Sequence, residues 1–262
     1  MTAILRTRDV TLRFGGVTAL EEVDVRVGPG EIVGVLGPNG AGKSTLFNVI
    51  SGFLRPEHGR VLFLEREIGH LLPYERVAAG IGRTFQHVRL FRSLTVYENL
   101  LAAQHRHLSS GSFAAMLRLP SARRDEREAA RRADAALELI DLGPWRDARP
   151  DELSYGTLRF LELACVLSLE PTVLLLDEPS SGIAQKEAEA LGPMLERIRD
   201  ERDCALLLIE HDMNVLLGVS ERVYAMDLGR IIAEGTPDEV VSDDRVLESY
   251  LGRTTGRARA PA

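Results

Sequence analysis

Nine consecutive residues near the N-terminus combine three glycines with a lysine and two hydroxyl side chains. They follow an apolar run and fit the pattern G-x-x-x-x-G-K-[ST]: Gly37, Pro38, Asn39, Gly40, Ala41, Gly42, Lys43, Ser44 and Thr45. Glycines let the backbone wrap so that successive N–H groups face one anion, and a helix that starts there adds its positive end. Lys43 offers a compact charge to the β- and γ-phosphates of a nucleotide, and Ser44 is placed to hold Mg²⁺. Of the 32 basic residues only Lys43 and Lys186 are lysines, so a lysine at position 43 indicates a chemical role.

A second segment places two carboxylates directly after an apolar run. Residues 173–176 precede Asp177, Glu178 and Pro179. A strand that ends at Asp177 brings this carboxylate beside the phosphate loop, where it organises the shell of the metal ion. Glu178 reaches the attacking water as general base, a role worth about 10²–10⁴-fold in rate. The alternative for the pair is an acidic cap on the next helix, but together with the phosphate loop the pair predicts hydrolysis of a nucleoside triphosphate.

Three short apolar runs predict the strands that position these groups. They are Ile32–Leu36, residues 173–176 and Ala205–Ile209, each too short for a helix and apolar on both faces, as in a parallel sheet. Helical patterns at residues 43–51, 94–142, 158–169 and 186–199 alternate with them, which favours an α/β fold. Alternating patterns at residues 4–14 and 23–27, with glycines between, predict a small antiparallel element.

The ends of the strand and helix patterns predict the domain organisation. Strand patterns are missing from residue 94 to 169, so we expect a helical subdomain, about residues 87–168, inserted into the α/β core. The whole of residues 1–252 then forms one domain. Residues 253–262 carry no periodicity and predict a disordered tail.

Composition and charge exclude several classes of protein. The net charge of −7 argues against nucleic acid as a partner held by a general basic field. No apolar run reaches the roughly 18 residues of a membrane span, and the start lacks an apolar signal-peptide core, which predicts a cytoplasmic protein. Cys165 and Cys204 lie in apolar stretches and are expected in the core, not in a disulfide or a metal cluster.

Residues 118–132 hold six arginines among acidic residues. The pairs Arg124/Glu128 and Glu128/Arg132 are four apart on one helix face, which predicts a solvated helix with weak ion pairs. The alternative is a local nucleic-acid patch.

With both phosphate segments in place, residues 5–252 resemble the ATP-binding-cassette family. The run Leu153-Ser154-Tyr155-Gly156-Thr157-Leu158-Arg159 looks like the family signature, and it lies upstream of the Asp177–Glu178 strand as in the family. The resemblance implies that the signature of one subunit closes over the nucleotide of another. Ser154 and Gly156, at a helix N-terminus, would then meet the γ-phosphate.

Three single residues extend this resemblance. Gln86 is similar to the glutamine that joins core and helical subdomain and contacts Mg²⁺ and water. His211 resembles the switch histidine that contacts the γ-phosphate, and Phe14 matches the aromatic residue that stacks on adenine. Taken alone, each also fits an ordinary loop, strand-end or core residue, but they occur in the family's order.

Two parts of the chain depart from the commoner family pattern. Tyr155 and Thr157 stand where glycine and glutamine are usual, and Ala184 stands where many members carry Asp or Asn. A missing hydrogen bond across the dimer is expected to weaken coupling between the two ATP sites by roughly 1 kcal/mol.

Residues 82–101, the insert at 105–131 and the ending at 246–252 resemble the ATP-binding subunits of branched-chain amino-acid importers. This resemblance implies a peripheral subunit on the cytoplasmic face of the membrane, with ATP and Mg²⁺ as ligands. The implied partners are two permeases, a second related ATPase or a second copy of this chain, and indirectly an extracytoplasmic binding protein. The residues expected to receive a permease helix are Val88, Leu90, Phe91, Leu94 and Tyr97, whose alternative role is the core of the helical subdomain.

Three other functions compete with the importer. A lipid-type exporter ATPase would not need the insert after His105. A soluble cassette protein for DNA repair, translation or cluster assembly is a further alternative. The lack of coiled-coil arms and zinc cysteines and the negative charge disfavour the first two of these roles. A plain P-loop kinase leaves the signature-like segment unexplained.

Overall fold

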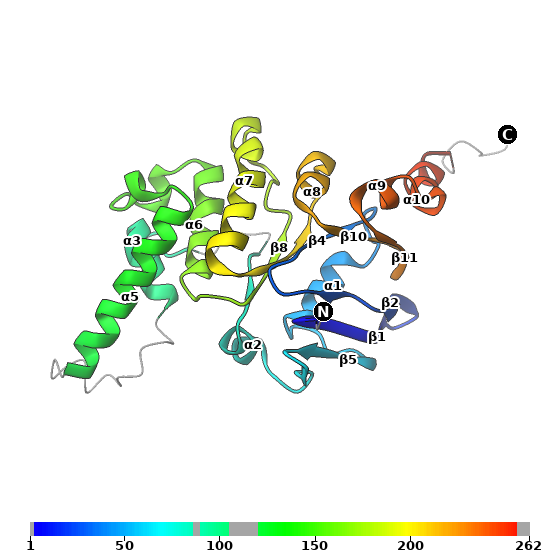
Figure 1. Ribbon diagram of the computed structural model, residues 1–262, viewed down its shortest axis with the longest axis horizontal. Coiled ribbons are helices and arrows are strands. Elements are labelled where there is room, and N and C mark those ends of the chain that lie inside the picture. Colours follow the sequence, from blue (N-terminus) through cyan, green and yellow to red (C-terminus); the bar gives the residue numbers. More distant parts are fainter. Residues whose placement is uncertain (1–2, 86–89, 105–119, 256–262) are drawn as a thin grey trace.

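A computed structural model describes residues 3–85, 90–104 and 120–255, and it confirms the expected α/β class (Figure 1). The larger sheet has the strand order β11-β10-β4-β9-β8-β7. Neighbouring strands are parallel except for the antiparallel pair β10–β11. The strands are β4 (Ile32–Leu36), β7 (Ile81–Arg83), β8 (Val173–Asp177), β9 (Ala205–Ile209), β10 (Arg222–Asp227) and β11 (Arg230–Gly235). The three predicted apolar runs are adjacent here as β4, β9 and β8.

The smaller sheet is antiparallel, as the start of the chain predicts. Its strands are β1 (Leu5–Phe14), β2 (Val17–Val23), β3 (Arg26–Val27), β5 (His58–Phe63) and β6 (Arg66–Glu67). The single strand expected at 23–27 is wrong, because β2 ends at Val23 and only Arg26–Val27 pairs again with β1. Between them Thr7 bridges the break. Its hydroxyl accepts from the backbone N–H of Val25 (2.8 Å) and donates to the carbonyl of Val23 (3.0 Å), and its backbone N–H donates to the carbonyl of Val25 (2.8 Å).

The core lies on both faces of the larger sheet. Alternate strand residues such as Val33 and Val35 pack with α1 (Lys43–Ile50) and the smaller sheet, whereas Ile32 and Leu174 pack with the helices of the opposite face. The other helices of the α/β core are α2 (Pro73–Ala79), α7 (Gln185–Arg202), α8 (Met213–Val219), α9 (Pro237–Val241) and α10 (Asp244–Thr255). The boundary expected after residue 252 therefore falls inside α10. Both cysteines are free, and burial raises the pKa of each thiol to about 12, in keeping with core packing.

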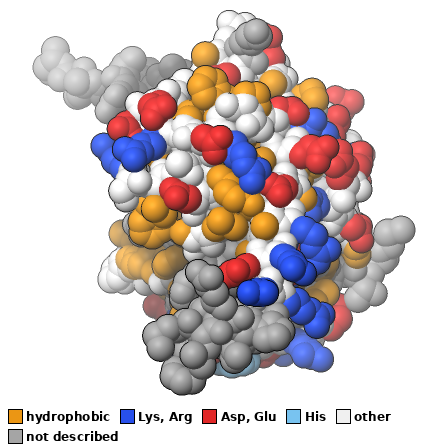
Figure 2. Space-filling model, turned by 90° about the vertical axis from the view of Figure 1, so that its left-hand side faces the viewer, with side chains coloured by type: hydrophobic (Ala, Val, Ile, Leu, Met, Phe, Trp, Pro, Cys, Tyr) orange, Lys and Arg blue, Asp and Glu red, His pale blue; other side chains and the backbone are white. Residues whose placement is uncertain are grey.

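The described part of residues 90–167 is helical and contains no strand. It holds α3 (Val96–Ala103), α5 (Pro120–Leu139), two 3-10 turns (Gly143–Trp145 and Pro150–Glu152) and α6 (Tyr155–Leu167). α6 begins three residues earlier than expected, because the Ser154 hydroxyl accepts the N–H of Thr157 (3.1 Å) and caps it. Figure 2 faces this end of the molecule and shows hydrophobic side chains gathered across its middle. Within the described residues, no helix is both long and apolar enough to span a membrane.

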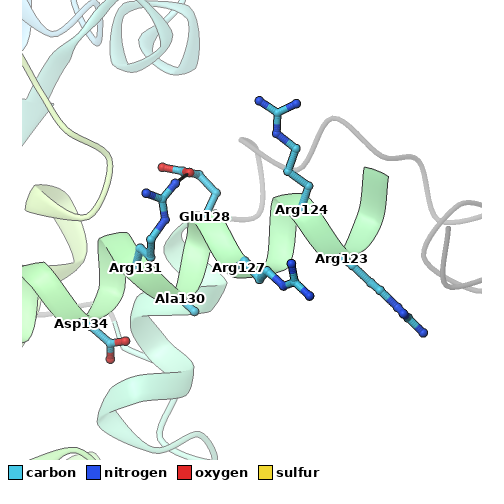
Figure 3. A pocket seen from close by; sticks show the side chains of 7 residues that line it. All are labelled: Arg123, Arg124, Arg127, Glu128, Ala130, Arg131 and Asp134. Carbon is cyan, nitrogen blue, oxygen red and sulfur yellow. Dashed lines mark hydrogen bonds and ion pairs between the residues drawn. The ribbon is translucent and has the colours of Figure 1, made fainter. Parts of the chain in front are cut away.

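The described part of the arginine-rich segment, residues 123–132 of α5, is largely exposed, as predicted for residues 118–132, whereas the rest of α5 packs Ala133, Ala136 and Leu137 into the core. Glu128 pairs with Arg132 (3.5 Å) and with Arg131. The expected pair with Arg124 is not among these contacts, and the Glu128 carboxylate turns towards Arg131 (Figure 3). Such exposed pairs add little stability.

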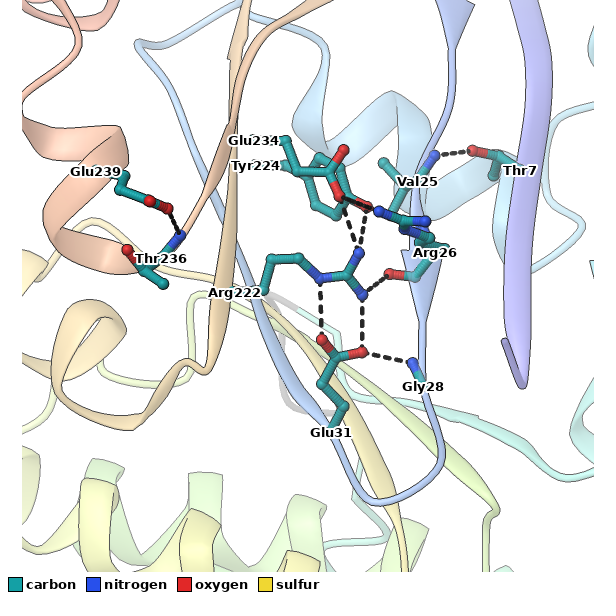
Figure 4. A network of polar contacts seen from close by, with 10 residues as sticks. All are labelled: Thr7, Val25, Arg26, Gly28, Glu31, Arg222, Tyr224, Glu234, Thr236 and Glu239. Atoms are coloured by element: carbon teal, nitrogen blue, oxygen red, sulfur yellow. Dashed lines mark hydrogen bonds and ion pairs between the residues drawn. The ribbon is translucent and has the colours of Figure 1, made fainter. Parts of the chain in front are cut away.

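A polar network joins the two sheets at the N-terminal end of β10 (Figure 4). Arg222 donates to both carboxylate oxygens of Glu31 (2.9 and 2.8 Å) and to Glu234 (2.9 Å). Glu234 also accepts from Arg26 of β3 and from the buried hydroxyl of Tyr224. The network therefore fixes the antiparallel element against the sheet that carries the phosphate loop.

Candidate active site

The phosphate loop connects β4 to α1 in a conformation that requires glycine. Gly37 and Gly42 have φ values of +151° and +105°. A Cβ at Gly42 would lie 2.7 Å from the carbonyl oxygen of Ala19, and one at Gly37 would collide with the carbonyl of Met226. The loop is thus seated against β2 and β10, with Ser44 exposed at the first turn of α1.

Lys43 lies almost buried beneath this loop, with 6% of its surface exposed. Its Nζ donates to the carbonyls of Gly37 (2.6 Å) and Pro38 (3.0 Å). Burial lowers the pKa of the ammonium, and the nearby carboxylates of Glu178 and Asp177 oppose this shift. A cation is therefore held where phosphates would enter the loop.

Asp177 ends β8 as expected, and its partner is a residue that the sequence analysis did not single out. Arg83 of β7 forms a buried ion pair with it, Nη2 to Oδ2 at 3.1 Å. Arg83 also donates to Oδ1 of Asn48 in α1 (2.8 Å) and to Oγ of Ser51, which directly follows α1 (2.7 Å). Burial raises the pKa of Asp177 and lowers that of Arg83, and the ion pair opposes both shifts. Arg83 therefore fixes the Asp177 carboxylate relative to the helix that follows the phosphate loop.

Replacing Arg83 by methionine is expected to lower the free energy of unfolding by about 3 kcal/mol. The substitution leaves the Asp177 carboxylate buried without its cation, which costs more than the loss of an exposed pair. Urea unfolding measures the change, with Arg60→Met at an exposed position as the control, expected within about 0.5 kcal/mol of wild type. An Arg83→Met protein as stable as wild type would show that Asp177 needs no cation.

Glu178 and His211, predicted from segments 33 residues apart, meet in the structure. His211 Nε2 lies 2.8 Å from Glu178 Oε1, and 18% of the Glu178 side chain is exposed. Glu178 has a φ of +52°, in the left-handed region that non-glycine residues rarely adopt. This turn directs the carboxylate towards the segment after β9. The arrangement leaves a carboxylate beside an imidazole that either accepts or donates a proton.

The signature-like segment contacts α7. The Ser154 hydroxyl donates to Glu187 Oε1 (3.2 Å), and a side chain at Gly156 would collide with the same carboxylate. Glu187 also accepts the N–H of Ala184 (3.2 Å), the N-cap residue of α7, which has no side-chain cap of its own. α6, which this segment opens, packs on the face of the larger sheet opposite α1. Ser154 and Gly156 are therefore presented away from the helix that follows this chain's own phosphate loop.

Of the remaining predicted residues, the structure describes Phe14 but not Gln86 or Val88. Phe14 ends β1 and is 51% exposed, in the hairpin whose second strand touches Gly42. An exposed aromatic ring there is free to stack on a base.

The donor set fits a Mg²⁺–nucleotide. Mg²⁺ prefers oxygen ligands, and the Ser44 hydroxyl and the Asp177 carboxylate are both oxygen donors. Only Oδ2 of Asp177 takes part in the ion pair with Arg83. The loop glycines and Lys43 supply the matching cradle for phosphates.

Fold and site together define a P-loop nucleoside triphosphatase with a helical subdomain inserted in its core. The model of the ABC transporter family matches residues 20–181, more than half of the chain, so the chain belongs to this family. It is an ATPase. A second family model, described as branched-chain amino acid ATP-binding cassette transporter, matches residues 230–254.

Relatives of this family match the chain over nearly its whole length. The high-affinity branched-chain amino acid transport ATP-binding protein LivG of Escherichia coli is 41% identical over 95% of this chain and 98% of its own length. The corresponding protein BraF of Pseudomonas aeruginosa is 39% identical over the same shares. A crystal structure of an ATP-binding cassette of an ABC transporter in its ADP conformation is 33% identical, with a TM-score of 0.83 over 96% of this chain and all of that one.

Proposed function

We propose that this chain is the ATP-hydrolysing subunit of an importer for branched-chain or related hydrophobic amino acids. The observation that carries the proposal is the end-to-end similarity to transport ATPases of that class, which includes the segment after β10. The chain needs no contact with the transported molecule, because ATP binding and hydrolysis change its affinity for a partner ATPase and thereby move the permeases.

In this proposal the residues of the site divide the chemistry among them. Glu178 takes the proton of the attacking water, and His211 holds Glu178 and contacts the γ-phosphate. The phosphate loop and Lys43 bind the phosphates, and Phe14 stacks on adenine. Ser154 and Gly156 bind the γ-phosphate held by the partner ATPase.

Mg²⁺ neutralises phosphate charge when bound. Ser44 and Asp177 are the described residues that hold it, with Gln86 as a further ligand. Arg83 keeps Asp177 in place for this role through the contacts described above. The proposed domain is residues 1–252, with the helical subdomain at about 87–168.

The proposed partners are two permeases, a second related ATPase or a second copy of this chain, and indirectly an extracytoplasmic binding protein. With these partners, the proposed location of the chain is the cytoplasmic face of the membrane. The proposed docking site for a permease helix is a cavity of about 420 Å³ beside the signature-like segment. It is lined by Leu90, Arg92, Pro150, Asp151, Leu153, Tyr155 and Leu158. Of the five residues expected to receive this helix, Leu90 lines the cavity, and Phe91 beside it is 62% exposed.

A pull-down of the tagged protein from detergent-solubilised membranes of its own cells tests the proposal. We expect two different multi-span permeases and a second ATPase, identified by mass. Soluble partners alone, or a permease of exporter type, would refute the amino-acid importer and leave the ATPase intact.

The same pull-down with one variant and its control tests the proposed docking surface. Phe91→Asp is expected to lose the permeases and keep its ATPase activity, because Phe91 is exposed beside the cavity. Leu64→Asp changes a similarly exposed residue, 53%, in the turn between β5 and β6, and should retain the permeases. Equal recovery of permeases with both variants would place the docking surface elsewhere.

A further inference from the structure

Glu210 is a buried carboxylate to which the reaction described above gives no role. It lies between β9 and His211, and 3% of its surface is exposed. Its Oε1 accepts the backbone N–H of Ser180 (2.9 Å), and its Oε2 accepts the backbone N–H of His211 (3.0 Å). Burial raises the pKa of this carboxyl, and hydrogen bonds from the Ser180 side chain and from the backbone N–H groups of Ser180 and His211 oppose the shift. Among the described residues Glu210 has no ion pair with an arginine or lysine, so uncharged donors, the two backbone N–H groups and the Ser180 side chain, hold it.

These two bonds belong to a set that ties the segment after β8 to the segment after β9. The backbone N–H of Glu178 donates to the carbonyl of Ile209 (2.9 Å), and the side chains of Glu178 and His211 meet at 2.8 Å. Glu178 keeps its left-handed φ of +52° between these bonds. A strained backbone of this kind persists only where its surroundings hold it.

A carboxylate suits this place because both of its oxygens accept. Its backbone partners, the N–H of Ser180 and the N–H of His211, are both donors, and the Ser180 side chain also hydrogen-bonds the carboxylate. A glutamine of the same shape has one accepting oxygen and one donating amide, so one N–H would face another donor. A buried donor left without an acceptor is costly, and the segments would separate to relieve it.

We propose that Glu210 is a positioning residue that holds the Glu178 and His211 backbones in register so that their side chains meet. It also ties the loop that begins at Ser180 and leads into α7 to the histidine segment. Glu210 acts through its two neighbours and does not touch the nucleotide. The inference rests on the proposed roles of Glu178 and His211 and names a residue that supports them.

The test is a double-mutant cycle of Glu210→Gln and His211→Ala, with ATPase activity measured against ATP concentration. We expect Glu210→Gln to lower kcat by about tenfold to a hundredfold, because a displacement of catalytic groups by about 1 Å costs up to that much. KM for ATP should stay within about twofold, since the phosphate loop is untouched. In the His211→Ala background Glu210→Gln should cause little further loss of kcat, because the contact between the Glu178 and His211 side chains is already absent.

Two results would overturn the proposal. One is a Glu210→Gln protein with the kcat of wild type, and the other is a loss that adds in full to that of His211→Ala, as a general loss of stability would. Glu201→Gln, an exposed carboxylate at the end of α7, is the matched control and should keep wild-type kinetics. If Glu210→Gln fails to fold, Glu210→Asp takes its place under the same criteria, because the shorter side chain cannot reach both donors.

The wild-type assay separates this inference from the proposed function. A wild-type protein without ATPase activity, or a His211→Ala variant with full activity, would refute the proposed roles of the site. An active wild type and an impaired His211→Ala variant, together with an unaffected Glu210→Gln variant, would refute the role of Glu210 alone.

Discussion

Replacing Glu178 by glutamine is expected to lower kcat for ATP hydrolysis by about 10²–10⁴-fold while ATP still binds. Glutamine keeps the shape of the side chain and its contact with His211 Nε2, which lies 2.8 Å from the carboxylate. It cannot take a proton from the attacking water. The phosphate loop and Lys43 lie on other segments and are unchanged, so the ATP-bound state should accumulate.

The consequence of this trapped state is a stable dimer. We expect gel filtration with Mg²⁺ and ATP to show Glu178→Gln as a dimer, or retained in the complex with its partner ATPase, whereas wild type dissociates after turnover. Phosphate release measures the loss of kcat, and Glu201→Gln serves again as the exposed control. A Glu178→Gln protein that stays monomeric with ATP at high concentration, both alone and with the partner ATPase, would contradict closure by ATP.

The parts of the site that could be predicted from the sequence are those formed by residues adjacent in the chain. The glycines and Lys43 share one loop, and Asp177 ends an apolar strand that Glu178 directly follows, so local patterns predicted both groups. Three strands could be predicted as apolar runs because both faces of each are buried: Ile32–Leu36, residues 173–176 and Ala205–Ile209. By contrast, β7 has three residues and β10 has charged residues at both ends, and their places depend on pairing with β8 and β4.

Arg83 and Glu210 could not be assigned roles from the sequence, because their partners are distant in the chain. Arg83 meets Asp177 across 94 positions, and Glu210 meets Ser180 across 30. Both contacts exist because β7 and β9 flank β8 in the sheet. The available signal was a charged residue in, or directly after, an apolar strand, which indicates a buried partner without naming it. Only the strand order of the folded sheet identifies these partners as Asp177 and Ser180.

Replacing Lys43 by alanine is expected to weaken ATP binding by about 10²-fold or more. Lys43 provides a nearly buried ammonium beneath the loop, and charge-assisted hydrogen bonds to phosphates are worth about 1.5–3 kcal/mol each. The carboxylates of Asp177 and Glu178 act on the same ammonium. Without the ammonium, the negative charge of these two carboxylates would be uncompensated where the triphosphate of ATP enters. The loss should therefore exceed that of a single hydrogen bond.

Titration with a fluorescent ATP analogue, with Mg²⁺ and with EDTA, measures the effect of Lys43→Ala. Lys43→Arg is the informative companion, because it keeps the charge and exchanges a compact ammonium for a planar fork. The ammonium reaches the carbonyls of Gly37 and Pro38 at 2.6 and 3.0 Å, which leaves no room for the larger group without movement of the loop. We expect Lys43→Arg also to bind weakly. Wild-type affinity in Lys43→Arg would mean that a positive charge at position 43 is enough for ATP binding. Wild-type affinity in Lys43→Ala would show that the loop does not bind ATP.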